Sequence, residues 1–166
     1  LSNRLSKVIK NKNIVMTNSC TSALTMALKL SNVDFGDEVI STSMTCLATN
    51  TPIINLGAKI IWADINPMTG NICPKDVAKK ISKKTKAVMC VNWAGLPCEL
   101  EELMKICNDN NIKLIQDAAH SFGSTYNNKS ISKFSHFTCF SFQAIKHFTT
   151  GDGGALICLN KSDLNR

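Results

Sequence analysis

Lys146 stands in a segment that could present a lysine as a nucleophile. It lies five residues after Ser141 and five before the glycine-rich turn 151–154, in a stretch that also carries Phe142 and Phe148. Apolar surroundings disfavour the charged form of a lysine, and an uncharged amine can attack a carbonyl group. A surface lysine whose stem packs along apolar neighbours would have the same local sequence. For this segment alone, the surface interpretation is favoured.

A carboxylate and a histidine follow an apolar segment that is typical of a buried strand. Asp117 comes directly after residues 112–116, and His120 follows three residues later. A buried carboxylate needs a partner, and the protonated pyridine nitrogen of pyridoxal phosphate (PLP) is a suitable one. Asp117 could instead cap a following helix, and His120 could hold the carboxylate or be a core histidine.

Residues 18–23 combine hydroxyl side chains with a predicted junction between a strand and a helix. Ser19, Thr21 and Ser22 stand where free backbone N–H groups and the helix dipole favour a phosphate. Serine and threonine also cap helices routinely, so the segment by itself favours plain N-capping.

Strand-length apolar segments alternate with helical patterns along the chain. The predicted strands are residues 14–16, 38–42, 59–63, 87–91, 113–116, 138–141 and 155–158. Helices are predicted between most of them, as at 21–31 and 99–108, where apolar residues recur on one face. The alternation predicts an α/β fold of three layers, in which helices flank a mostly parallel sheet. Ligands of such sheets bind at the carboxyl ends of the strands, where the residues described above should lie.

Length and composition favour one globular domain over other classes. The chain has 166 residues, of which 44% are hydrophobic and 19% charged. The net charge of +7 makes a nucleic-acid-binding module an alternative, but the lysines are spread out, and the cluster at 79–86 is typical of a solvated helix face. The eight cysteines have no regular spacing, and we see no signal peptide, so we expect a reduced, cytoplasmic protein. We expect neither a structural zinc site nor a membrane partner.

In order and spacing, the motifs of residues 18–155 resemble the cofactor domain of the DegT/DnrJ/EryC1/StrS family of sugar aminotransferases. The resemblance is carried by residues 21–24, 36–40, 57–58, 85–87, 117–120, 141–146 and 153–154. It implies the large domain of a fold type I enzyme with PLP as cofactor. It also implies transfer of an amino group from an amino acid, with glutamate as the expected donor, to a nucleotide-linked keto-sugar.

The resemblance assigns roles to individual residues. Lys146 falls on the family's Schiff-base lysine, Asp117 on the acid that pairs with the pyridine nitrogen, and His120 on a residue near the cofactor ring. The phosphate-binding positions of the family fall on Thr21, Ser22 and Ser141.

Cys46 departs from the family pattern. It stands where family members often place an aromatic residue that stacks on the pyridine ring, and a cysteine can pack there but offers no aromatic face. Trp93 is an alternative source of an aromatic face, but a core position is the preferred explanation for this tryptophan.

The same resemblance leaves other activities open. A branch of the family that dehydrates sugars has histidine in place of the lysine, and here Lys146 is retained although His147 follows it. Transamination is therefore preferred, and a non-catalytic PLP-binding homologue remains an alternative. Both ends of the sequence fall in helix-like patterns, so we expect residues 1–166 to be part of a PLP-binding large domain. The small C-terminal domain is then absent from this chain, and the full-length protein is expected to be a homodimer.

Overall fold

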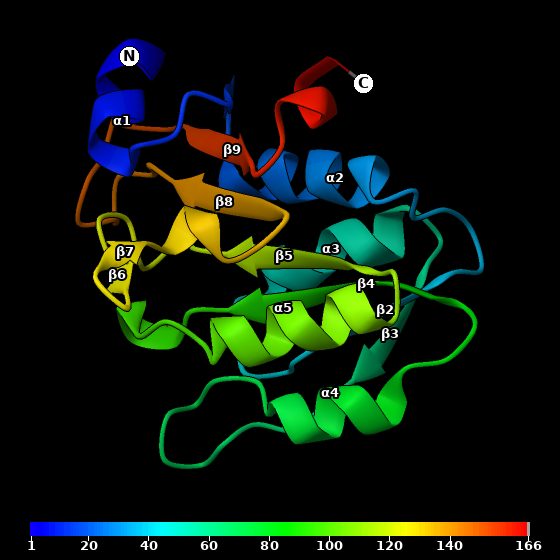
Figure 1. Cartoon of the computed structure of the whole chain (residues 1–166). Coiled ribbons are helices and arrows are strands. Elements are labelled where there is room, and N and C mark those ends of the chain that lie inside the picture. The colour runs from blue at the N-terminus through cyan, green and yellow to red at the C-terminus, as the bar shows by residue number, and fades with distance from the viewer. Residues whose placement is uncertain (166) are drawn as a thin grey trace.

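A seven-stranded sheet separates the helices into two layers in the computed structural model, which describes residues 1–165 (Figure 1). The order of the strands across the sheet is β1-β9-β8-β5-β4-β2-β3. Their bounds are β1 Ile14–Thr17, β2 Glu38–Ser41, β3 Lys59–Trp62, β4 Thr85–Val91, β5 Lys113–Asp117, β8 Phe137–Ser141 and β9 Gly154–Cys158. Each predicted strand is present, with bounds that differ from the prediction by no more than two residues at either end. The predicted α/β fold with a mostly parallel sheet is confirmed.

Strand β9 alone runs against the others in this sheet. It pairs antiparallel with both β8 and β1, whereas the pairs β2·β3, β2·β4, β4·β5 and β5·β8 are parallel. Parallel neighbours need a long crossover, usually a helix, but residues 142–153 between β8 and β9 form a loop without a regular helix. The chain therefore turns back beside β8, and β9 begins at the edge of the sheet where the parallel strands end.

Helices cover both faces of the sheet. Their bounds are α1 Ser2–Ile9, α2 Cys20–Leu30, α3 Leu47–Asn55, α4 Pro74–Lys80 and α5 Leu100–Asp109. Short elements complete the fold: 3-10 turns η1 Trp93–Gly95, η2 Ile131–Lys133 and η3 Lys161–Asn165, and a small hairpin of β6 Thr125–Tyr126 and β7 Lys129–Ser130. The helices predicted at 21–31 and 99–108 correspond to α2 and α5, each displaced by one residue.

The alternation of side chains along the strands produces two cores. In β4, Ala87 and Met89 face the core beneath α2 and α3, whereas Val88 and Cys90 face the core beneath α1, α4 and α5. All four side chains are fully buried. Because successive side chains of a strand point to opposite faces, one apolar strand can serve both layers.

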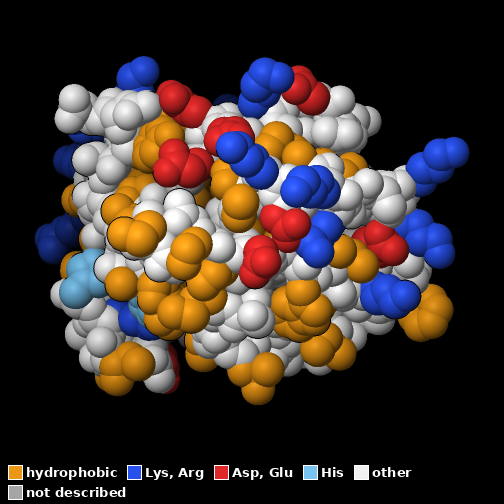
Figure 2. All heavy atoms as spheres, turned by 90° about the horizontal axis from the view of Figure 1, so that it is seen from below, with side chains coloured by type: hydrophobic (Ala, Val, Ile, Leu, Met, Phe, Trp, Pro, Cys, Tyr) orange, Lys and Arg blue, Asp and Glu red, His pale blue; other side chains and the backbone are white. Residues whose placement is uncertain are grey.

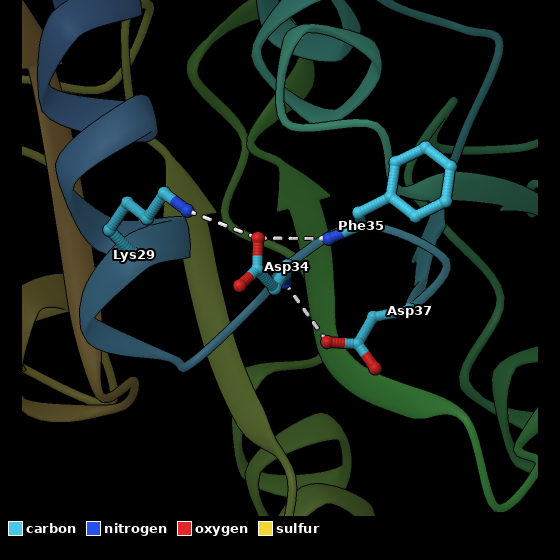
Figure 3. A network of polar contacts seen from close by, with 4 residues as sticks. All are labelled: Lys29, Asp34, Phe35 and Asp37. Atoms are coloured by element: carbon cyan, nitrogen blue, oxygen red, sulfur yellow. Dashed lines mark hydrogen bonds and ion pairs between the residues drawn. The ribbon is translucent and has the colours of Figure 1, made fainter.

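The turn between α2 and β2 is organised by two aspartates (Figure 3). The Oδ1 atom of Asp34 accepts from the Phe35 N–H at 3.0 Å and lies 3.5 Å from Nζ of Lys29, while the Asp34 N–H donates to Oδ2 of Asp37 at 2.9 Å. The Phe35 N–H and the Lys29 ammonium lower the pKa of Asp34. None of the residues in this exposed network lines the cavity described below.

The lysine cluster of residues 79–86 does not form a single helix face. Helix α4 ends at Lys80, which pairs with Asp76 at 3.6 Å, and the remaining lysines lie in the following loop and in β4. On the face drawn in Figure 2, lysine and arginine side chains are interspersed with acidic and apolar ones. Within residues 1–165, no helix is long and apolar enough to cross a membrane.

Candidate active site

A cavity of about 330 Å³ opens at the edge of the sheet where the parallel strands end. Its lining comes from the segments that follow β1 and β2, from the ends of β5 and β8, and from the loops that follow these two strands. It includes five of the seven residues proposed from the sequence: Thr21, Cys46, Asp117, Ser141 and Lys146. Side chains separated by up to 125 positions in the sequence thus meet in one place.

Asp117 is the last residue of β5 and is held on both carboxylate oxygens. Its Oδ2 accepts from the Thr49 hydroxyl at 2.7 Å, and its Oδ1 accepts from the Ala119 N–H at 3.0 Å. The Cys20 thiol lies 3.8 Å from Oδ1. Asp117 is only 5% exposed, so these donors satisfy a carboxylate that water hardly reaches. No helix begins directly after Asp117, because residues 118–124 form turns and short connections, so Asp117 does not cap a following helix.

Cys20 begins α2 and faces Asp117. Burial is the main cause that raises the pKa of the Cys20 thiol well above its usual value, and the negative charge of Asp117 adds to it. The thiol is therefore neutral and serves as a weak third donor to the carboxylate.

The amino-terminal end of α2 forms one wall of the cavity. The Ser19 hydroxyl caps the helix by accepting from the Ser22 N–H at 3.1 Å. The N–H groups of Cys20 and Thr21 make no hydrogen bond to the described residues, as is usual at the first turn of a helix. The start of α2 can therefore be capped and also bind an anion. The cap uses the Ser22 N–H, and the N–H groups of Cys20 and Thr21 stay without an acceptor among the described residues at the cavity wall.

Ser22 is turned away from this wall. Its hydroxyl donates to Oδ1 of Asn18 at 2.6 Å and lies 3.0 Å from the Ser19 hydroxyl. The residue is not among those that line the cavity. Its backbone N–H and hydroxyl both act in the cap.

Lys146 lies in the loop between β8 and β9. The loop is closed by hydrogen bonds from the Phe142 N–H to the Gly153 carbonyl at 2.8 Å and from the Thr150 N–H to the Phe142 carbonyl at 3.0 Å. Lys146 is half-buried and lines the cavity. Of the aromatic side chains nearby in the sequence, Phe142 is buried beneath the loop, whereas Phe148 is 36% exposed.

His147 points to a different place from its neighbour Lys146. Its Nε2 lies 2.8 Å from the Phe122 carbonyl oxygen, and it is not among the cavity-lining residues. The lysine of this pair, and not the histidine, thus faces the cavity.

His120 lies beside the cavity without lining it. Its ring meets the ring of Trp93 edge-on, with 5.8 Å between the centroids. Partial burial lowers the pKa of His120, as does the positive charge of Lys146, and Asp117 opposes both. The imidazole is therefore close enough to feel both charges, but it donates none of the hydrogen bonds that hold Asp117.

Trp93 does not face the cavity and cannot replace the missing aromatic residue in this arrangement. It packs between His120 and Gly70, where a Cβ atom on the glycine would stand 2.9 Å from the indole. Cys46, by contrast, is exposed at the N-cap position of α3 and lines the cavity.

Several cavity residues were not singled out from the sequence. The most informative is Thr49, because its hydroxyl contacts Asp117 across 68 positions of sequence. The i, i+4 spacing of Thr45 and Thr49 was the available signal, since residues at this spacing share one face of a helix. The other residues of this kind are Cys20, Leu24, Ala48, Ala119, Gln143, Ile145, Asp152 and Gly153.

A family model matches residues 1–165 and is described as the DegT/DnrJ/EryC1/StrS aminotransferase family. The chain belongs to this family. The resemblance found in the sequence motifs is thereby confirmed.

Two relatives are similar to this chain over most of its length. The spore coat polysaccharide biosynthesis protein SpsC of Bacillus subtilis is 37% identical over 145 residues, which are 87% of this chain and 37% of the relative. The GDP-perosamine synthase of Escherichia coli O157:H7 is 36% identical over 146 residues, 88% of this chain and 40% of the relative. The chain thus spans about two fifths of the length of these family members.

Solved structures of the family show the same fold. NtdA from Bacillus subtilis, solved with bound cofactor PMP, is 28% identical with a TM-score of 0.93, over 98% of this chain and 37% of that one. The PLP form of Spr1654 from Streptococcus pneumoniae is 29% identical with a TM-score of 0.92, over 99% and 48% of the two chains. The sheet and its helices match the large domain of the family's PLP aminotransferases.

The residues that line the cavity match the chemical groups of PLP. Two free N–H groups with nearby hydroxyls suit a phosphate, a buried carboxylate suits a protonated ring nitrogen, and a lysine amine suits an aldehyde. Thr21 and Ser141 supply the hydroxyls, and Asp117 and Lys146 supply the other two groups.

Proposed function

We propose that this chain forms the PLP-binding part of an aminotransferase that moves an amino group from glutamate to a nucleotide-linked keto-sugar. The observation that carries the proposal is the convergence of Lys146, Asp117 and the start of α2 on one cavity. Membership of an aminotransferase family supports the same conclusion.

Each residue has a distinct task in this proposal. The amine of Lys146 would hold the aldehyde carbon of the cofactor, and its Nζ would move a proton at the α-carbon of the amino donor. Asp117 accepts a hydrogen bond from the protonated ring nitrogen. Bound PLP supplies an electron sink for the negative charge that the donor's α-carbon develops.

The phosphate would be fixed at the end of α2. The N–H groups of Cys20 and Thr21 and the hydroxyls of Thr21 and Ser141 are the proposed donors, and the helix dipole favours the negative charge. Ser22 supports this group indirectly through the cap. His120 is proposed to lie near the cofactor ring, on the side where Trp93 supports it.

Transamination is preferred over sugar dehydration because of the positions of Lys146 and His147. Proton transfer at the donor's α-carbon needs a base that reaches the cavity, and Lys146 lines it. His147 is occupied at the Phe122 carbonyl instead. The histidine therefore does not stand in for the lysine.

The acceptor is inferred from the named relatives. Besides the GDP-perosamine synthase, a 34% identical relative from Helicobacter pylori is named UDP-4-amino-4,6-dideoxy-N-acetyl-beta-L-altrosamine transaminase. Both names specify a sugar linked to a nucleotide. The chain spans about two fifths of the length of such relatives. We therefore propose that the sugar site also needs a small C-terminal domain. We further propose that the full-length protein is a cytoplasmic homodimer, in which the partner subunit completes this site.

The test is an absorbance spectrum of the purified full-length protein with PLP, recorded before and after glutamate is added. The proposal expects a PLP band that glutamate converts to that of the amino form, followed by recovery when a nucleotide keto-sugar is supplied. A PLP band that neither substrate changes would indicate a non-catalytic homologue. Salt-sensitive DNA binding without any PLP band would overturn the proposal in favour of a nucleic-acid-binding module.

A further inference from the structure

The carboxylate of Asp117 stands at the end of a chain of two hydroxyl groups. Oγ1 of Thr45 and Oγ1 of Thr49 are 2.7 Å apart, and the Thr49 hydroxyl donates to Oδ2 of Asp117 at 2.7 Å. Because an ionised carboxylate only accepts, the Thr49 proton must point to Asp117. Thr45 is then the donor to Thr49, and the two bonds strengthen each other.

Thr49 is placed for this contact by the first turn of α3. Its N–H donates to the carbonyl of the N-cap residue Cys46 at 3.0 Å, and its side chain is only 1% exposed. The same turn carries Cys46 and Ala48, which line the cavity. The bond from Thr49 therefore joins the cavity wall formed by α3 to the acid at the end of β5.

The neighbouring residue Asn50 fixes the helix independently of Asp117. Its Oδ1 accepts from the Ser41 hydroxyl at 2.7 Å, and its Nδ2 donates to the Thr42 carbonyl at 3.0 Å. Since α3 is already anchored to the end of β2 by these bonds, the Thr49 hydroxyl is not needed to hold the helix in place. Its specific effect is to fix the rotation of the carboxylate.

We propose that Thr49 is a positioning residue that acts through Asp117, and that Thr45 supports it. The Thr49 hydroxyl holds Oδ2, and the Ala119 N–H holds Oδ1. The carboxylate plane is thus set before any cofactor binds, so no binding energy is spent on orienting it. This inference rests on the proposed function, in which Asp117 accepts from the cofactor's ring nitrogen.

The test compares Thr49→Val with Thr49→Ser, and uses Thr51→Val as a matched control. Thr51 is on the same helix, but its hydroxyl donates to the Leu47 carbonyl of that helix at 2.9 Å. Two quantities are measured: the dissociation constant of PLP by titration, and the rate at which glutamate converts bound PLP. The valine variant should lose roughly tenfold in rate, as expected for one hydrogen bond to a charged group, and should bind PLP several-fold more weakly. The serine variant should restore both quantities, and the control should match the original protein.

A double-mutant cycle decides whether Thr49 acts through Asp117. If it does, Thr49→Val should have little further effect on PLP affinity or rate in the Asp117→Asn background, because the two residues work as one unit. Additive losses, or a loss that Thr49→Ser does not restore, would overturn the inference while leaving the proposed function intact. If Asp117→Asn alone changed neither quantity, the proposed function itself would fail.

Discussion

Gly154, the first residue of β9, lies directly against the backbone of Ser19 at the start of α2. A Cβ atom at Gly154 would stand 2.5 Å from the Ser19 carbonyl oxygen and 2.7 Å from the Cys20 nitrogen. No side chain fits there unless the helix moves. The close approach of strand and helix therefore sets where the free N–H groups of α2 meet the cavity.

Gly154→Ala should displace the start of α2 and weaken PLP binding. Overpacking at such a contact costs about 1–3 kcal/mol of folding free energy. Gly36→Ala is the control, because Gly36 has a positive φ of 82° but open space around its Cβ position, in a turn outside the cavity lining. Both variants should unfold at lower denaturant concentration, and only Gly154→Ala should raise the dissociation constant of PLP. Equal PLP affinity in both would contradict the proposed phosphate site.

Lys146 should carry the cofactor after chemical trapping. Borohydride reduction of the protein with PLP, followed by peptide mapping by mass spectrometry, should place the phosphopyridoxyl group on Lys146. Lys146→Ala should abolish the label, and Lys133→Ala, at an exposed position outside the cavity lining, should leave it unchanged. A label on another lysine would refute the assignment.

Asp117→Asn should preserve the fold and most PLP binding but slow the reaction with glutamate by orders of magnitude. An amide keeps the shape of the carboxylate but does not keep the ring nitrogen protonated, so the electron sink is lost. Stopped-flow absorbance measures the conversion of bound PLP, and circular dichroism checks the fold. An unchanged rate would disprove the role of Asp117.

Cys46→Phe and Cys46→Trp should be tolerated and should tighten PLP binding. Cys46 is exposed at the cavity wall, and a stacked aromatic pair adds roughly 0.5–1.5 kcal/mol. PLP titration of both variants, with Cys73→Phe outside the cavity lining as a control, measures the gain. Weaker binding in both variants would mean that the side chain at position 46 meets a packed wall.

Protonation of His136 should destabilise the fold in mild acid. Its Nδ1 accepts from the Leu114 N–H at 3.0 Å, so the folded state requires the neutral ring. Burial, aided by the charge of Lys113, lowers the pKa of His136 to about 4 from the usual 6.5. The unfolded chain therefore binds more protons between these values, and stability is full above pH 6.5 and falls as the pH drops toward 4. We expect a loss on the order of 2 kcal/mol, less than the full shift implies because solvent screens part of it.

Denaturant unfolding at pH 7 and pH 4.5 measures this loss. The matched variant is His136→Asn, because an amide oxygen can accept the same N–H but does not titrate. The stability difference between the two pH values should shrink in the variant. An equal difference in both proteins would assign the acid sensitivity to other groups.

The sequence alone determined the fold class and most of the candidate site. Apolar runs such as residues 87–91 have the length and composition of strands buried on both faces, and the polar residues that follow them must lie at one edge of a parallel sheet. For this reason the order of residue types along the chain was enough to place Thr21, Asp117, Ser141 and Lys146 together. Local periodicity carries this information because it depends only on neighbours in the chain.

Only the tertiary structure decided which side chains face the cavity and which atoms hold them. Lys146 and His147 are adjacent in the sequence, yet only the first lines the cavity, because the second is held at Phe122. The bond from Thr49 to Asp117 joins segments 68 positions apart. Such contacts depend on where the first turn of α3 lies relative to the end of β5, and the spacing of residues along one chain segment does not specify the distance to another.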